Sequence, residues 1–105
     1  MISSEERISL ALHSVVVASN EQISAHLGEE VVILGFKHGS YYSLDQVGLF
    51  VWNLLQEPHA VADICNAILE EYEVEFERCK QDLFALLTEL SAVQLIEIHD
   101  ENGRS

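Results

Sequence analysis

The hydrophobic and polar positions follow different periods in the two halves of the chain. In the front half, Ser14–Ala18 (SVVVA) and Val31–Phe36 (VVILGF) are short, apolar and rich in β-branched residues, which predicts strands. Gly39 can then take the positive φ that a tight hairpin turn requires, and Tyr41–Leu44 is predicted as the returning strand. We expect a three-stranded antiparallel sheet, or a hairpin with a loosely attached partner. The polar stretch Asn20–Gly28 is predicted to be a loop with a helical turn.

The back half has the 3.6-residue period of amphipathic helices. Asp45 is the predicted N-cap of a first helix, which should end at Pro58 because proline disfavours helical backbone in the residue before it. The second helix, about Ala60–Tyr72, and the third, about Glu75–Ser91, each carry six apolar residues on one stripe. Val93–Ile98 is predicted as a short extended tail. Strands followed by three helices are typical of an α+β domain of the winged-helix kind.

The length and the apolar runs indicate one soluble domain. The 105 residues contain no repeat or linker, so we expect a single domain over residues 1–105 with its core at about 14–98. The longest apolar runs are only a few residues, far below the ~20 that cross a membrane. Glu5 and Glu6 precede the first apolar residues, which is unlike a signal peptide. We therefore expect a cytoplasmic location and no membrane partner.

The net charge of -13, from 18 acidic and five basic residues, argues against a nucleic-acid partner. Proteins that bind nucleic acids use clustered basic side chains to displace counterions from phosphates. The third predicted helix, which would be the recognition helix of a winged-helix protein, carries four acidic residues against Arg78 and Lys80. We expect a polymeric partner to be neutral or basic, and a basic peptide segment would be attracted at long range.

The chain shows no pattern typical of a catalytic or metal site. Its five histidines are dispersed, and none stands four residues from another histidine or a cysteine. Cys65 and Cys79 are fourteen positions apart with no CxxC pair, so we expect two buried free thiols. Motifs for serine hydrolysis, phosphate binding and zinc proteolysis are absent from the sequence. We expect neither an enzyme nor a cofactor.

Four segments follow one another in a specific order: GEEVVILGFKHGSYYSLD, VGLFVWNLLQEP, ADICNAILEEYEV and CKQDLFALLTELSAVQLIEI. Together they fix a turn, two tyrosines, an Asp cap, a Trp, a Pro and Asp82. This order spans Gly28–Ile98, about two thirds of the chain. It resembles the PqqD-like family, also called RiPP recognition elements, and most closely the stand-alone B1-type proteins of lasso-peptide biosynthesis.

The chain departs from the pattern of that family at two places. His59-Ala60 stands where the family commonly has a Ser or Thr that caps the second helix, so a weaker helix start is expected. Val93-Gln94 stands where a glycine commonly precedes the terminal Leu-Ile pair. The geometry of the turn after the third helix is therefore left open by the sequence.

The resemblance implies a domain that binds the leader segment of a ribosomally made precursor peptide. The leader would lie as an extra antiparallel strand beside the third strand, in a cleft whose other wall is the third helix. An exposed strand edge, with its unpaired backbone groups, fits this use. Tyr41 and Tyr42 point to opposite faces of the strand, so only one can line the cleft, and the sequence does not say which. The residues predicted to contact the peptide are Ser40, Tyr41, Tyr42, Ser43, Leu44, Cys79, Lys80, Asp82, Leu83 and Leu86.

Core packing is the alternative interpretation of Leu83, and a plain sheet-face position is the alternative for the tyrosines. The partners implied by the resemblance are a leader peptidase, which is a B2-type cysteine protease, and a macrolactam-forming cyclase. A second interpretation with the same fold is a PqqD-type peptide chaperone for a radical SAM enzyme in quinone cofactor biosynthesis. Interpretations from other classes are a winged-helix transcription regulator and a small structural or toxin-partner module.

Overall fold

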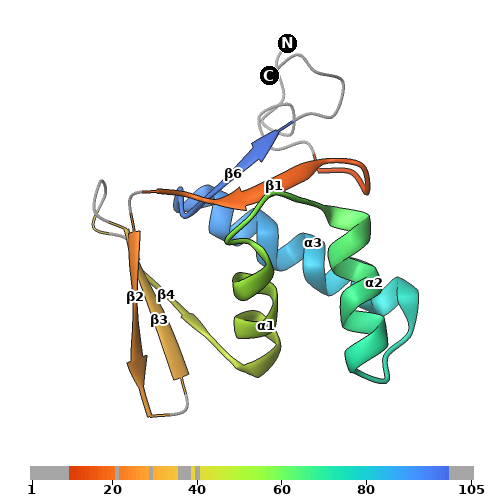
Figure 1. Ribbon diagram of the computed structural model, residues 1–105, viewed down its shortest axis with the longest axis horizontal. Helices are drawn as coiled ribbons and strands as arrows, with labels where there is room; N and C mark the ends of the chain where they lie inside the picture. The colour runs from red at the N-terminus through yellow and green to blue at the C-terminus, as the bar shows by residue number, and fades with distance from the viewer. Residues whose placement is uncertain (1–9, 21, 29, 36–38, 40, 100–105) are drawn as a thin grey trace.

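The computed structural model of the chain describes residues 10–20, 22–28, 30–35, 39 and 41–99. Four strands come first along these residues and the three helices follow, with two further short strands between and after them, which fits the predicted α+β class (Figure 1). In chain order the elements are β1 Val15–Ala18, β2 Gln22–Leu27, β3 Glu30–Gly35, β4 Tyr41–Leu44, α1 Gln46–Leu54, β5 His59–Ala60, α2 Val61–Glu71, α3 Phe76–Ala92 and β6 Ile96–His99.

One antiparallel sheet has the strand order β2-β3-β4 and stands at one end of the molecule, away from α2 (Figure 1). Its strand β2 lies in the stretch that was predicted to be a loop with a helical turn, and that prediction was wrong. Every residue from Gln22 to Leu27 pairs with β3. The sequence QISAHL does alternate polar and apolar residues, which is the period of a strand. The three-stranded sheet therefore begins with β2 and not with Ser14–Ala18.

The first predicted strand belongs to a second antiparallel sheet, in the order β5-β1-β6. Val15 pairs with both Ala60 and His99, so β1 joins parts of the chain that are far apart in sequence. The predicted extended tail is β6, which packs beside β1 and follows a turn at the end of α3. This second sheet lies along one side of the three helices (Figure 1).

Left-handed backbone occurs in three turns of the described residues, at Gly28, Gly39 and Gln94. Gly39 has φ 64°, as the hairpin between β3 and β4 requires, whereas Lys37 and His38 of that turn lie outside the described residues. Gln94 has φ 63° at the position where a glycine is common in the family. The Gln94 N–H donates to the Ser91 carbonyl at 3.0 Å, and the Leu95 N–H donates to the Leu90 carbonyl at 2.9 Å. A glutamine therefore makes the turn that closes α3.

The helix starts use different means of capping. The Asp45 carboxylate accepts a hydrogen bond from the Gly48 N–H at 2.8 Å, which confirms it as the N-cap of α1. At α2 the N-cap residue Ala60 offers no side-chain bond. Instead, the backbone N–H groups of Val61 and Ala62 donate to the carbonyls of Ser14 and Leu12 at 2.8 and 2.9 Å. The segment that leads into β1 thus replaces the Ser or Thr cap.

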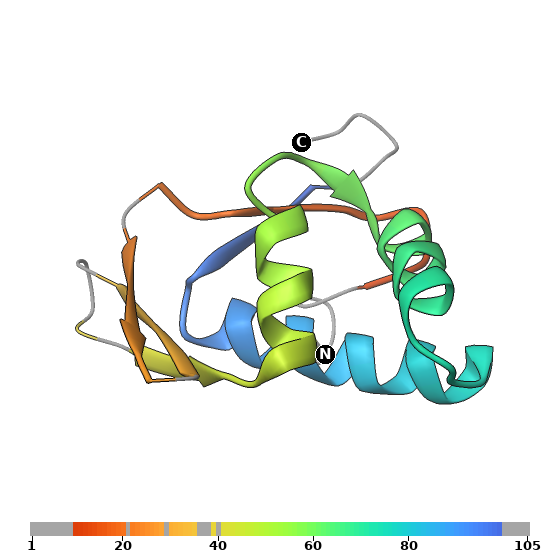
Figure 2. The same cartoon turned by 60° about the horizontal axis from the view of Figure 1, so that its bottom comes forward.

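One hydrophobic core joins the helices to both sheets, and α1 crosses its centre (Figure 2). The largest fully buried side chains come from β3, from the three helices and the residues that follow them, including Ile33, Leu55, Ile64 and Leu87. Both cysteines, Cys65 on α2 and Cys79 on α3, are buried free thiols, as predicted. Their Sγ atoms are 3.9 Å apart, with no disulfide between them. Among the described helices, none is long and apolar enough to cross a membrane.

Candidate functional site

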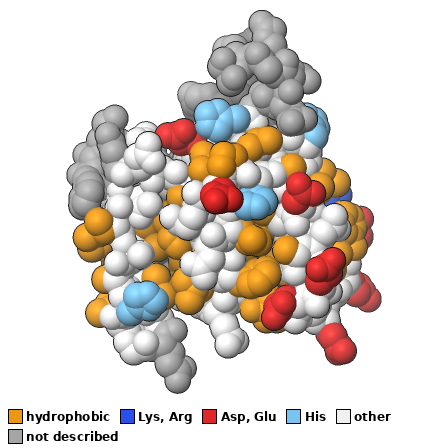
Figure 3. Space-filling view, in the orientation of Figure 1, with side chains coloured by type: hydrophobic (Ala, Val, Ile, Leu, Met, Phe, Trp, Pro, Cys, Tyr) orange, Lys and Arg blue, Asp and Glu red, His pale blue; other side chains and the backbone are white. Residues whose placement is uncertain are grey.

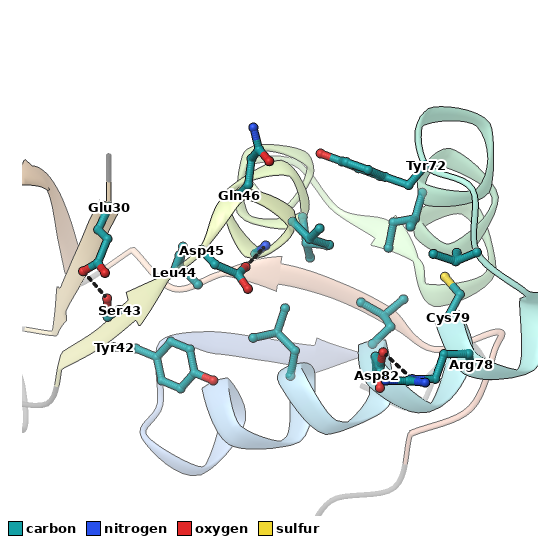
Figure 4. Close-up of a pocket in the computed structure, with 17 residues that line it drawn as sticks. Glu30, Tyr42, Ser43, Leu44, Asp45, Gln46, Tyr72, Arg78, Cys79 and Asp82 are labelled. Atoms are coloured by element: carbon teal, nitrogen blue, oxygen red, sulfur yellow. Dashed lines mark hydrogen bonds and ion pairs between the residues drawn. The ribbon is translucent and has the colours of Figure 1, made fainter. Parts of the chain in front are cut away.

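A groove of about 1020 Å³ lies between the β2–β3–β4 sheet and the helices (Figure 4). Strand β4 provides one side with Tyr42, Ser43 and Leu44, and it leads directly into the start of α1. Helix α3 provides the opposite side, and the end of α2 closes the far end. The remaining lining residues are Glu30, Asp45, Gln46, Val47, Gly48, Val51, Ile68, Tyr72, Val74, Arg78, Cys79, Asp82, Leu83 and Leu86.

The structure brings seven of the ten predicted contact residues into this groove: Tyr42, Ser43, Leu44, Cys79, Asp82, Leu83 and Leu86. Tyr41 is not among the lining residues and is 70% exposed on the other face of β4. Lys80 does not line the groove either. Its ammonium lies 5.9 Å from the centre of the Phe76 ring on the same helix. Ser40 lies outside the described residues. Tyr42, and not Tyr41, is therefore the tyrosine that faces the groove.

Tyr42 connects the two sides of the groove. Its side chain lies over α3 (Figure 4). Its hydroxyl donates a hydrogen bond to the Glu89 carboxylate. This bond, together with burial and the negative charges of Glu89 and Asp45, raises the pKa of Tyr42 to about 12. The phenol therefore stays protonated and keeps donating over the whole physiological pH range.

The floor of the groove is apolar. Leu83 and Cys79 of α3 are 2% and 5% exposed, so they belong to the core and the groove at once. Leu83 is therefore a core residue, which was the alternative interpretation, and also a residue of the groove floor. Tyr72, at the end of α2, packs edge-on against the Phe50 ring with their centres 5.7 Å apart. Apolar side chains that alternate along a peptide strand would find contact surface here.

Acidic groups surround this floor. Asp45 and Glu30 lie beside β4, and Asp82 lies on α3 (Figure 4). The Arg78 Nε donates to the Asp82 carboxylate at 3.1 Å, and both side chains are well exposed to solvent. An exposed pair of this kind is worth less than about 1 kcal/mol, so a charged ligand can exchange for it at low cost. The acidic side chains favour a ligand that carries a Lys or Arg.

Nothing in the described residues forms a metal site or an activated nucleophile. No group of three His, Cys, Asp or Glu side chains in the described ranges is placed to hold a metal ion. Burial, with the neighbouring Cys79, raises the pKa of the Cys65 thiol to about 11. A thiol with such a pKa is a poor nucleophile at neutral pH.

Residues 30–96 match the protein family described as Coenzyme PQQ synthesis protein D (PqqD). The chain belongs to the PqqD family. The match begins at the first residue of β3 and ends at the first residue of β6, so it contains every element that lines the groove. A comparison with curated proteins found no significant match.

Two solved structures share the fold of this PqqD-family chain. One is TbiB1 in complex with the TbiA(beta) leader peptide, which is 37% identical with a TM-score of 0.69. The alignment covers 77% of this chain and 94% of TbiB1. The other is a lasso peptide synthetase B1 complexed with the leader peptide, at 26% identity and a TM-score of 0.68, covering 78% and 96% of the two chains. The resemblance to B1-type proteins and the α+β fold class are confirmed.

Several groove residues of the PqqD-family chain were not predicted as site residues. Val47 and Val51 are four positions apart on α1, and Tyr72 ends the apolar stripe of α2. Their helical spacing was visible in the sequence, but it indicates only that they share a face. Glu89, the partner of Tyr42, gave no signal, because its role depends on where β4 lies against α3.

Proposed function

We propose that this chain is a non-catalytic adaptor that binds the leader segment of a ribosomally made precursor peptide in the groove between β4 and α3. The observation that carries the proposal is a strand edge that opens onto an apolar groove. Among the described strands β4 pairs only with β3, so its other edge has no strand partner. Membership of the PqqD family and the two relatives solved with leader peptides support this function.

The leader would bind by strand addition along the free edge of β4. An open edge promotes unwanted association unless a partner strand is meant to fill it. Alternate residues between Ser40 and Leu44 would supply backbone hydrogen bonds, and Ser40 itself lies outside the described residues. Every second side chain of the added strand would point toward Leu83 and Leu86 of α3. A good leader would therefore have apolar or aromatic residues at alternate positions.

Electrostatics would add to the binding and to its rate. The net charge of -13 gives the domain a strongly negative field, and acidic side chains gather over its helical side (Figure 3). A basic residue of the leader would pair with Asp82 in place of Arg78, or with Asp45 at the start of α1. Binding should then weaken as the salt concentration rises.

The direct partner would be a leader peptidase of the B2-type cysteine-protease class, followed by a macrolactam-forming cyclase. The raised pKa of Cys65 and the lack of a metal-binding group of side chains in the described residues support the proposal that another protein performs the cleavage. The whole chain of 105 residues would act as one peptide-recognition domain. Its task would be to hold the precursor so that the cleavage site reaches the peptidase.

The test is a titration of labelled protein with the leader peptide of the precursor gene that neighbours this gene, followed by NMR and calorimetry. We expect saturable shifts of the amides of β4 and of α3 between Cys79 and Leu86. A peptide of the same composition in scrambled order is the control and should cause no such shifts. If the leader causes no saturable change in these amides, the adaptor function is rejected.

A second candidate is a peptide chaperone for a radical SAM enzyme in quinone cofactor biosynthesis. The observation that favours it is the family description itself, which names coenzyme PQQ synthesis. Both candidates use the same groove and differ in the enzyme that receives the peptide. Neighbouring genes for a protease and an asparagine-synthetase-like cyclase would support the first, and a gene for a radical SAM enzyme would support the second.

A further inference from the structure

The β2–β3–β4 sheet has a second face, which points away from the core, although two of its residues, Glu30 and Ser43, also border the groove. Opposite residues of an antiparallel pair point to the same side, so the pairing register defines this face. Leu34 of β3 is paired with Ile23 on one side and with Tyr41 on the other, which makes a row across all three strands. The full set on this outer face is Ile23, Ala25, Leu27, Glu30, Val32, Leu34, Tyr41 and Ser43.

This outer face is apolar and open to solvent. Ile23, Leu34 and Tyr41 are 48%, 39% and 70% exposed, and Leu27 is 61% exposed. Glu30 is the one charged residue among the described residues of the face, in a chain with 18 acidic residues. Figure 3 shows hydrophobic side chains at the edge formed by this sheet, while the acidic ones gather over the helices. Single exposed apolar residues are ordinary, but an aligned row across a sheet indicates a contact surface.

The outer face is continuous with the edge where the leader is proposed to bind. Along β4, Tyr42 and Leu44 point to the groove side, and Tyr41 and Ser43 point to the outer face. A leader strand paired with β4 follows the same alternation, so every second one of its side chains joins the outer face beside Tyr41 and Ser43. Binding of the leader therefore enlarges the outer face from three strands to four.

We propose that the outer face of the β2–β3–β4 sheet is the docking surface for the protein that processes the leader-bound precursor, and that this partner contacts the Ile23–Leu34–Tyr41 row together with the bound leader. This inference rests on the proposed leader binding. The partner needs an apolar contact patch that is not acidic. A partner that reads both chains prefers the complex to the free domain, because only the complex presents the fourth strand.

The net charge of the chain argues against a second copy of it as the protein that binds the outer face. Two copies would bring net charges of -13 and -13 together, and repulsion of that size opposes association at low ionic strength. A neutral or basic protein meets no such repulsion. The uncharged row then supplies the contact, and the acidic body of the domain attracts the partner at long range.

The experiment uses the leader peptidase encoded beside this chain as the probe, with the full chain and its leader peptide. The outer-face variant combines Ile23→Ser and Leu34→Ser, which lie on β2 and β3 and not on the strand that pairs with the leader. The matched control is His26→Ser, because His26 is an exposed residue on the opposite side of β2. Leader affinity and peptidase affinity are measured separately, the latter with and without leader, and circular dichroism checks that both variants fold.

We expect the outer-face variant to bind the leader within twofold of the parent and to bind the peptidase at least tenfold more weakly. His26→Ser should change neither affinity, and leader should raise the affinity of the parent for the peptidase at least tenfold. Equal peptidase binding by variant and parent, or no peptidase binding by the leader-loaded parent, would overturn the inference while leaving leader binding intact. A dimer in sedimentation that the variant abolishes would also overturn it, in favour of a second copy. Failure of the parent to bind leader would reject the proposed function itself.

Discussion

The phenol of Tyr42 on β4 donates a hydrogen bond to the carboxylate of Glu89 on α3, 47 residues along the chain. This bond ties together the two elements that face each other across the groove. Leu44 of β4 and Leu83 and Leu86 of α3 also line the groove, but their apolar side chains form no directional bond. The pair therefore fixes how far β4 stands from α3, and with it the width available to a peptide strand.

Removing the Tyr42 hydroxyl should loosen the groove. For Tyr42→Phe we expect a loss of about 1 kcal/mol in the free energy of unfolding, the usual net value of one such bond. Leader affinity should fall severalfold, because the groove must be ordered again on binding. Urea unfolding and calorimetry with the leader measure the two effects. Tyr41→Phe is the control and should change neither, since Tyr41 is 70% exposed outside the groove.

The same hydrogen bond should make stability depend on alkaline pH. The folded state raises the pKa of Tyr42 from 10.0 to about 12, so it holds this proton more tightly than the unfolded chain does. The stabilisation is then complete below pH 10 and is lost as the pH rises toward 12. The free-energy difference between the parent and Tyr42→Phe should shrink over this window, as measured by urea unfolding. Cys65 is present in both proteins, so its own raised pKa cancels in the difference. A constant difference from pH 8 to 11.5 would contradict the assignment.

A charge placed on the helix side of the groove should block the peptide. Leu86 lines the groove and is half-buried, so Leu86→Glu puts a carboxylate against the apolar floor and beside Asp82. We expect leader affinity to fall more than tenfold, because an apolar leader side chain would bury this charge. Ala85→Glu adds the same charge to the exposed side of the same helix and should leave affinity within twofold. Equal losses in both variants would show that net charge, and not groove contact, controls binding.

The sequence predicts the local elements better than the way they meet. The helical periods locate α2 and α3 to within about one residue, because an amphipathic stripe is a local property. The pairing of β1 with β5 and β6 joins Val15 to Ala60 and His99, and no local pattern indicates such partners. For the groove, the alternation of side chains along a strand predicts that Tyr41 and Tyr42 point to opposite faces of β4. Only the structure, in which Leu44 of the same strand is buried, shows that Tyr42 is the one that points inward.

The strand β2 was missed for a different reason. QISAHL alternates correctly, but all six of its residues are partly or fully exposed, so no apolar run marks it. Its strand is held by backbone pairing to β3. Glu89 likewise carried no signal, since a glutamate on a helix surface is ordinary until β4 brings Tyr42 beside it.

Gln94 should be a site where glycine stabilises the protein. Its φ of 63° is left-handed, which costs a residue with a Cβ about 1 kcal/mol or more, while glycine takes it freely. Gln94→Gly should therefore raise the free energy of unfolding by about 0.5 kcal/mol, after allowing for the greater freedom of glycine in the unfolded chain. Ala92→Gly, two residues earlier at the helical end of α3, is the matched control and should lower it by about 1 kcal/mol. Urea unfolding of the three proteins gives the comparison.

Because the backbone N–H groups of Gln94 and Leu95 keep their partners on α3, leader affinity should not change. If both substitutions destabilise alike, the left-handed turn is not under strain, and the glutamine side chain contributes contacts that offset its backbone cost.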